Sequence, residues 1–251
     1  QALDGSAMGG VSGGTIASAE SFVGLAKPLG PQCLDPGFQE GKSPALRFPY
    51  AVGDQHERDG SFLGPSIMEA VNQKVVYRTR GLLDDLYGKD FCWQQFTSVK
   101  SRLGYIAARA LLGAANVALG NKTVKSLLLR VGVLPKPGEG PGEKVRASGY
   151  FNEWVYGKLS PPEGKDEKEF PPIEAMVHVE GTRGDPGYQL TSAMSLHTAL
   201  LLSRKADLAS EINMLGGVLT PASCMGDLLW KELPAVNVTF ELKPNINQRL
   251  S

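Results

Sequence analysis

Two short segments of the chain carry side chains that could do chemistry. The segment Gly184-Asp185-Pro186-Gly187-Tyr188 is a turn directly before a helical pattern, so Asp185 is a candidate cap for that helix. A helix N-terminus favours an anionic or carbonyl oxygen nearby, and the phenol of Tyr188 could donate a proton there or simply cover a sheet. In a proline-rich loop, Lys136 and Glu139 are the charged side chains that we expect to contact substrate. Turns and caps account for Asp185, Lys136 and Glu139, and for each we favour this structural interpretation over a catalytic one, whereas the pattern leaves both roles of Tyr188 open.

Other motifs are weaker. Gly10-Val11-Ser12-Gly13-Gly14 fits the G-x-S-x-G turn of hydrolases, but no apolar strand precedes it. A hydrolase would also need a histidine that is oriented by an acid, and two of the chain's three histidines lie in positions typical of structural ones. No cluster of His, Cys, Asp and Glu has metal-ligand spacing, so we expect no metal. No strand, G-x-G-x-x-G turn and helix follow one another, which predicts no nucleotide-binding domain within these residues.

Composition restricts the class of protein. The 251 residues are 42% hydrophobic, enough to bury a core, and 26 basic residues balance 26 acidic ones. A neutral chain is a poor nucleic-acid binder, so we expect no nucleic acid partner. Three cysteines without a C-x-x-C pair, Cys33, Cys92 and Cys224, predict a reducing intracellular compartment, either cytoplasmic or organellar.

The last third of the chain gives the clearest secondary structure. Residues 150–156 and 173–181 alternate apolar and polar types, which predicts an antiparallel hairpin with a long solvated tip. A helix over 188–204, a helix opened by Thr220 and Pro221, and a strand over 236–242 follow. The chain is therefore predicted to be α+β, with a largely antiparallel or mixed sheet and helices packed on one face.

The earlier residues are predicted to belong to the same domain, 1–251. Residues 1–25 form a junction segment, in which Thr15, or alternatively Ser12, caps a short helix. Residues 26–65 are a long Pro/Gly-rich loop, and sheet and helices occupy 66–251. Within the last region we predict a helix over 66–86 and a strand over 91–99.

One apolar run does not fit a simple soluble domain. Residues 103–119 read LGYIAARALLGAANVAL, shorter than the roughly 20 residues of a spanning helix and interrupted by Arg109 and Asn116. We interpret the run as a buried core helix. A peripheral membrane contact through 103–130 remains the alternative, because Lys122, Lys125 and Arg130 follow the run.

Four segments together resemble the saccharopine dehydrogenase-like oxidoreductases, a group that includes the trans-acting enoyl reductases. They are Gly10–Ser18, Leu134–Glu143 followed by Gly149-Tyr150-Phe151, Gly184–Tyr188 leading into the helix with Met194, and Gly216–Ala222 leading into Met225-Gly226-Asp227. Their order and approximate spacing agree with that family. The turn and cap positions within them are Gly13, Gly14, Thr15, Gly187, Gly217 and Thr220.

The resemblance implies a two-part protein. An amino-terminal Rossmann domain would bind NAD or NADP, and this chain would be the substrate-side domain, binding neither cofactor by itself. The implied activity is reduction of a carbonyl, imine or enoyl group. The alternative is a non-catalytic docking subunit of a homo-oligomer or larger assembly, which the long loop and the apolar run favour.

Overall fold

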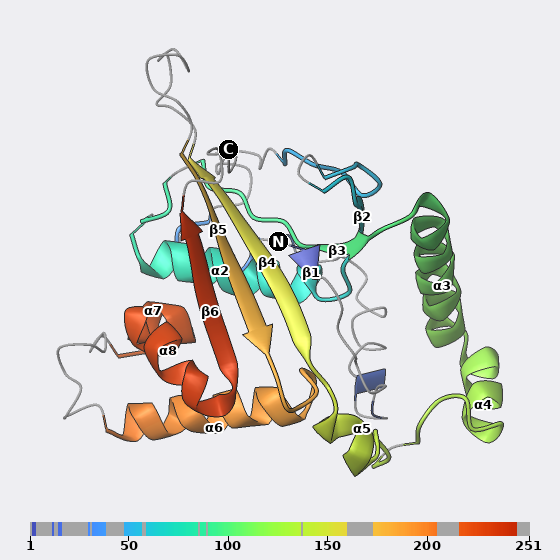
Figure 1. Ribbon diagram of the computed structural model, residues 1–251. Helices are drawn as coiled ribbons and strands as arrows, with labels where there is room; N and C mark the ends of the chain where they lie inside the picture. Colours follow the sequence, from blue (N-terminus) through green and yellow to red (C-terminus); the bar gives the residue numbers. More distant parts are fainter. Residues whose placement is uncertain are drawn as a thin grey trace.

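The protein's computed structural model describes residues 2–3, 12, 15–16, 30, 32–38, 48–56, 59–84, 86–88, 90–136, 138–159, 173–204 and 216–244. Six strands form one sheet in the order β2-β3-β1-β4-β5-β6 (Figure 1). Three long antiparallel strands, β4 (Phe151–Leu159), β5 (Ile173–Gly181) and β6 (Val238–Pro244), make up one half. The other half is the antiparallel pair β2 (Phe62–Pro65) and β3 (Phe96–Val99).

A two-residue strand joins the halves. β1 (Ala2–Leu3) runs parallel to β3 and antiparallel to β4, which makes the sheet mixed. Both β1 and β2 lie before residue 66, so the sheet draws on the predicted junction segment and on the predicted loop. Turn preference over 26–65 concealed β2 because its four residues include a glycine and a proline.

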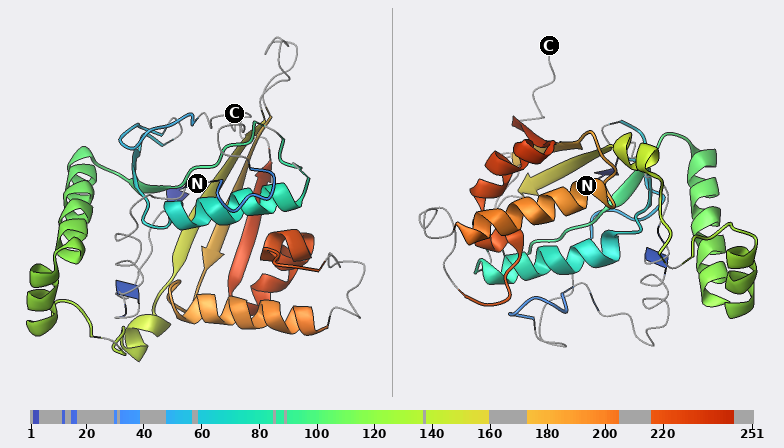
Figure 2. Two further views of the ribbon diagram at one scale, coloured as in Figure 1. Left: turned by 180° about the vertical axis from the view of Figure 1, so that it is seen from behind. Right: turned by 90° about the horizontal axis from the view of Figure 1, so that it is seen from below.

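Helices cover one face of the sheet, as predicted for an α+β domain (Figure 2). They are α2 (Glu69–Leu82), α6 (Gln189–Ser203), α7 (Pro221–Met225), α8 (Asp227–Glu232) and the 3₁₀ turn Leu233–Val236. The core beneath α6 is formed by Phe151, Leu190, Leu233 and Val238. Gly181 lies opposite Phe151, where a Cβ would stand 2.1 Å from a carbon of the phenyl ring. Only glycine lets the ring pack flat on β5.

The strand predicted over 91–99 begins only at Phe96. The preceding residues instead hydrogen-bond to α2: the N–H of Trp93 donates to the hydroxyl of Tyr77 at 3.1 Å, and the N–H of Gln95 donates to Glu69 Oε1 at 3.3 Å. The aromatic content predicted a strand. Instead, the backbone N–H groups of Trp93 and Gln95 bond to side chains of α2.

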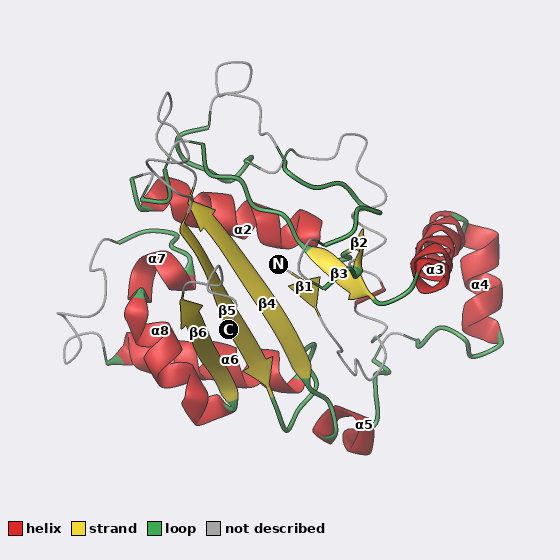
Figure 3. Ribbon diagram, turned by 45° about the horizontal axis from the view of Figure 1, so that its top comes forward, coloured by secondary structure: helices red, strands yellow, loops and turns green. Residues whose placement is uncertain are grey.

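Two helices stand apart from this body (Figure 3). α3 (Arg102–Gly120) and α4 (Lys122–Arg130) form a hairpin, and α5 (Glu143–Ala147) leads the chain back to β4. No residue of α3 or α4 is buried, so the predicted core helix is wrong. Within the described structure α3 packs mainly on β2, β3 and α4, and none of its residues is buried.

Candidate functional site

Two of the four motif segments meet at the hydroxyl of Tyr188. The backbone N–H of Ser12 donates to Tyr188 Oη at 2.6 Å, and Thr15 Oγ1 lies 2.8 Å from the same oxygen. Gly140, in the proline-rich loop, lies beside Ser12, because a Cβ on it would lie 3.5 Å from Ser12 Cβ. The site therefore joins residues that are up to 176 positions apart.

Asp185 places Tyr188 by capping α6. Its carboxylate accepts the N–H groups of Gly187 at 3.1 Å, Tyr188 at 2.9 Å and Gln189 at 3.3 Å. The residue is 2% exposed, so these bonds satisfy an otherwise costly buried charge. Only the N–H of Gln189 belongs to α6, so the predicted capping role is met at one helix position, and the other two bonds hold the turn before the helix. These three N–H groups are therefore not available to an anionic ligand.

The turn that carries Asp185 is held against the start of β4. Gly184 N–H donates to the carbonyl of Gly149 at 3.0 Å, and Asp185 N–H donates to the carbonyl of Arg146 at 2.7 Å. A Cβ on Gly149 would stand 2.3 Å from Asp185 Cα. The glycine before β4 is thus required by a close backbone approach.

Ser12, and not Thr15, caps the helical turn that begins the chain's first motif. Ser12 Oγ accepts the N–H of Thr15 at 3.1 Å, and the Ser12 carbonyl accepts the N–H of Ile16 at 3.1 Å. The first choice of cap was therefore wrong and the alternative correct. Thr15 lies inside the turn, which frees its hydroxyl for Tyr188. Gly13 and Gly14 fall outside the described residues.

Lys136 and Glu139 contact each other within their loop. Glu139 Oε2 accepts the backbone N–H of Lys136 at 2.8 Å, and the N–H of Glu139 donates to the Lys136 carbonyl at 2.9 Å. Both residues are exposed. They shape the loop that brings Gly140 to Ser12, and their contact with substrate stays a prediction.

Hydrogen bonding perturbs the acidity of Tyr188. Burial acts to raise its pKa, but hydrogen bonds from Ser12 and Thr15 outweigh burial and hold the pKa below the usual 10.0. A phenolate at this position would keep both donors, because an N–H and a hydroxyl can each donate to it. The arrangement suits a phenol that releases a proton and is stabilised afterwards.

The fourth motif lies elsewhere. Thr220 caps α7 in a capping box with Ser223, as predicted, and its hydroxyl lies 2.8 Å from that of Thr79 on α2. Arg78 donates to the carbonyl of Val218. Gly217 adopts a φ of +122°, a conformation that favours glycine. This motif therefore fastens α7 to α2.

A buried polar network under α2 escaped the sequence analysis. Gln95 is 2% exposed, and its side chain donates to Glu153 Oε1 at 3.2 Å and accepts from Asn72 Nδ2 at 2.8 Å. Burial raises the pKa of both Glu153 and Glu69. The alternation of β4 was the available signal, because it places Glu153 on the same side of the strand as Phe151.

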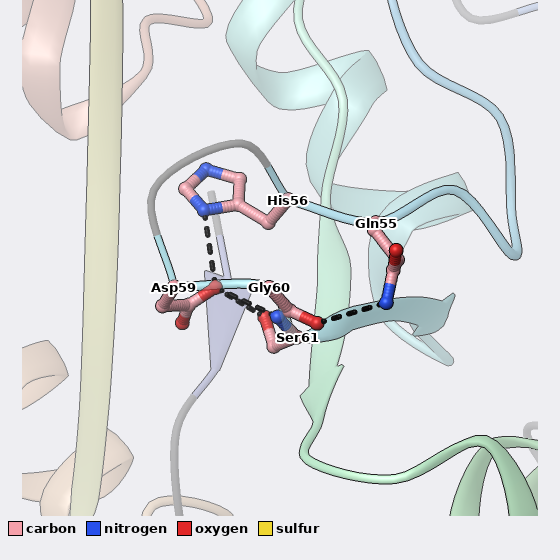
Figure 4. Close-up of polar contacts among 5 residues, drawn as sticks. All are labelled: Gln55, His56, Asp59, Gly60 and Ser61. Carbon is pink, nitrogen blue, oxygen red and sulfur yellow. Dashed lines mark hydrogen bonds and ion pairs between the residues drawn. The ribbon is translucent and has the colours of Figure 1, made fainter.

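A loop before β2 brings a histidine, an aspartate and a serine together (Figure 4). Asp59 Oδ1 lies 3.4 Å from His56 Nδ1 and accepts the hydroxyl of Ser61 at 2.8 Å. In a hydrolytic triad the serine hydroxyl hydrogen-bonds the histidine. Here the hydroxyl of Ser61 bonds Asp59, so the three residues do not form such a triad. Among the described residues no group of His, Cys, Asp and Glu could hold a metal ion.

The remaining histidines have structural surroundings. His178 stacks on Trp154 with ring centroids 4.1 Å apart, and His178 Nε2 lies 3.1 Å from Asn152 Oδ1. His197 Nε2 lies 3.6 Å from Glu232 Oε2. Neither histidine approaches a nucleophile through these contacts.

Comparison with known proteins identifies relatives. Over 250 residues, 93% of this chain, it is 30% identical to a Mycobacterium tuberculosis (strain ATCC 25618 / H37Rv) protein whose name assigns it provisionally as a trans-acting enoyl reductase. It is also 30% identical over 187 residues to the trans-acting enoyl reductase of Mycobacterium ulcerans (strain Agy99), and 29% identical over 189 residues to one from the same M. tuberculosis strain. These alignments cover 72% and 73% of this chain.

The chain spans only part of these relatives: 56% of the first, 41% of the second and 42% of the third. No family model matches it, and no solved structure matches it. The chain is thus similar to trans-acting enoyl reductases over most of its length.

Proposed function

We propose that this chain is the substrate side of an oxidoreductase that reduces an enoyl group, or alternatively a carbonyl or imine, and that Tyr188 supplies the proton. The observation that carries the proposal is the Tyr188 hydroxyl held by Ser12 and Thr15, where two motif segments meet. The names of the relatives favour an enoyl substrate. The wider saccharopine dehydrogenase-like assignment belongs to the same proposal.

Reduction of an enoyl group adds a hydride at one carbon and a proton at the other. In the proposed step, the hydride adds to the β-carbon and the Tyr188 hydroxyl hydrogen-bonds the carbonyl oxygen, where the enolate charge develops. The Tyr188 proton passes to that oxygen, and the enol becomes the saturated product when its O–H proton is lost to water and the α-carbon takes a proton from water. The phenolate left behind is stabilised by the N–H of Ser12 and the hydroxyl of Thr15, which are already positioned. General acid catalysis of this kind contributes about 10²- to 10⁴-fold.

The hydride donor in this proposal is NADH or NADPH. The described residues do not fit it. In the one glycine-bearing turn that leads from a strand into a long helix, between β5 and α6, Asp185 already accepts the N–H groups of the turn and of Gln189, where a pyrophosphate would bind. We therefore assign nicotinamide binding to residues other than these.

The test uses the natural protein. Incubation with NADH or NADPH and a trans-2-enoyl thioester should give enoyl-dependent oxidation of the nicotinamide, and the saturated thioester should appear by mass spectrometry. An aldehyde and an imine tested in parallel identify the reducible group. If the protein binds neither NADH nor NADPH, or oxidises neither with any substrate, the proposal fails.

A non-catalytic docking role is the second candidate. The exposed apolar hairpin of α3 and α4 favours it, because an exposed apolar surface of this kind is typical of an interaction site. Docking and catalysis are compatible, since the hairpin extends from the β2–β3 end of the sheet (Figure 1), whereas Tyr188 lies directly before α6.

A further inference from the structure

The α3–α4 hairpin carries an apolar stripe that nothing in the described structure covers. On α3 it is formed by residues spaced at intervals of three and four: Leu103, Ile106, Ala107, Ala110, Leu111, Ala114 and Val117. Leu103, Leu111 and Val117 are 81%, 72% and 69% exposed. Such spacing places them on one side of the helix. A continuous exposed stripe of this length marks an interaction site.

The opposite side of α3 is already used. Tyr105 stacks on Phe62 of β2 with ring centroids 6.2 Å apart, and Gly104 lies against Val99 of β3. Asn121 ends α3 and caps α4 by accepting from Thr123 and Val124, so the second helix turns back beside the first. The hairpin is therefore fixed to the sheet by one face and presents the other.

The charge of this region differs from that of the rest of the chain. Residues 91–138 contain no Asp or Glu but seven basic residues: Lys100, Arg102, Arg109, Lys122, Lys125, Arg130 and Lys136. The remaining residues then hold 26 − 7 = 19 basic side chains against all 26 acidic ones. A chain of zero net charge thus concentrates positive charge around its exposed apolar helix.

We infer that the α3–α4 hairpin docks on the surface of a membrane that contains anionic lipids. Such a surface attracts a helix that has apolar residues along one face, basic residues beside them and no acidic residues, because the basic side chains are drawn to the anionic lipids. α3 has the length and composition of a spanning helix, with 19 residues and a mean hydropathy of 1.3. One face of α3 packs on β2 and α4, however, so in this proposal the hairpin lies in the membrane–water interface and does not span the membrane.

The test is flotation of the natural protein with vesicles of phosphatidylcholine alone and with added phosphatidylglycerol. We expect binding to the anionic vesicles, weakened by salt, and little binding to the neutral ones. Leu111→Ser with Val117→Ser should reduce binding by about ten-fold or more. The control Leu196→Ser changes a leucine on α6 that is 63% exposed and should bind as the unaltered protein does.

Lys122→Glu with Arg130→Glu should remove the preference for anionic vesicles while circular dichroism stays unchanged. Equal binding to both vesicle types would overturn the inference, as would binding that survives the Leu111 and Val117 changes. Absence of vesicle binding also overturns it. In that case, size-exclusion chromatography showing a dimer that the same changes dissociate would assign the face to a second copy of the chain.

Discussion

The hydroxyl of Tyr188 accepts a hydrogen bond of 2.6 Å from the backbone N–H of Ser12, 176 residues earlier in the chain. Ser12 also caps the turn that holds Thr15 against the same oxygen. The side chain directly before α6 is thus tied to Ser12 and Thr15 by two hydrogen bonds. The predictions below concern that oxygen, the turn that positions it and the network beneath α2.

Tyr188→Phe should reduce enoyl reduction by the natural protein about 10²- to 10⁴-fold, because it removes the proposed proton donor but keeps the ring. Steady-state kinetics would show the loss mainly in kcat. Tyr87→Phe is the matched control, since Tyr87 is 42% exposed and its ring contact with Phe91 needs no hydroxyl. Equal activity of the two variants would contradict the role of Tyr188.

Thr15→Val should raise the pKa of Tyr188, because it removes one of the hydrogen bonds that lower this pKa. A proton donor loses activity as pH rises through its pKa, so the alkaline limb of the pH–rate profile should move to higher pH. The control is Thr239→Val, which changes an exposed residue of β6. Its pH–rate profile should not move. An unshifted limb in Thr15→Val would mean that Tyr188 is not the group titrating.

Asp185→Ala should lower the free energy of unfolding by about 2 kcal/mol. The change leaves the N–H groups of Gly187, Tyr188 and Gln189 without their buried acceptor. Asp185→Asn keeps one acceptor oxygen and should cost less. Urea denaturation measures both. If the two variants are equally stable, the carboxylate is not the cap that positions Tyr188.

Gly149→Ala should cost about 1–3 kcal/mol, because the new methyl group would collide with the backbone of Asp185. Gly157→Ala, within β4, is the control: the nearest atom to its Cβ would be the Ala175 carbonyl oxygen at 3.9 Å. Thermal unfolding of the two proteins compares them. A neutral Gly149→Ala would show that the approach of the turn to β4 is loose.

Glu153→Gln should stabilise the protein at neutral pH. Burial raises the pKa of Glu153 above its usual 4.5, so between the two pKa values the folded state holds more protons than the unfolded state. The stability contributed by this group is full below the unfolded pKa and is lost as pH rises through the folded one. Urea denaturation from acidic to neutral pH should show that loss in the parent and a smaller one in Glu153→Gln.

The control for that series is Glu241→Gln, which changes an exposed residue of β6 and should leave the pH dependence of stability unchanged. If stability depends on pH to the same extent in the parent protein and in Glu153→Gln, Glu153 is not the buried acid responsible.

Local patterns predicted much of the fold. The hairpin of β4 and β5, helix α6 and the Thr220 cap follow from side-chain alternation, helical spacing and capping chemistry between neighbouring residues. The prediction was wrong where one pattern permits two environments. The apolar residues of α3 indicate a helix with apolar faces, but periodicity does not say whether protein, lipid or solvent meets each face.

By itself, the sequence determined the α+β class, the elements after residue 150 and Asp185 as a cap, because each depends on residues that are near one another in the chain. Only the tertiary structure decided that Ser12 and Thr15 reach Tyr188, that Gln95 joins Glu153 to α2, and that α3 stands outside the core. These features depend on contacts between segments far apart in the sequence. Such contacts arise when the sheet assembles, and no local spacing encodes them.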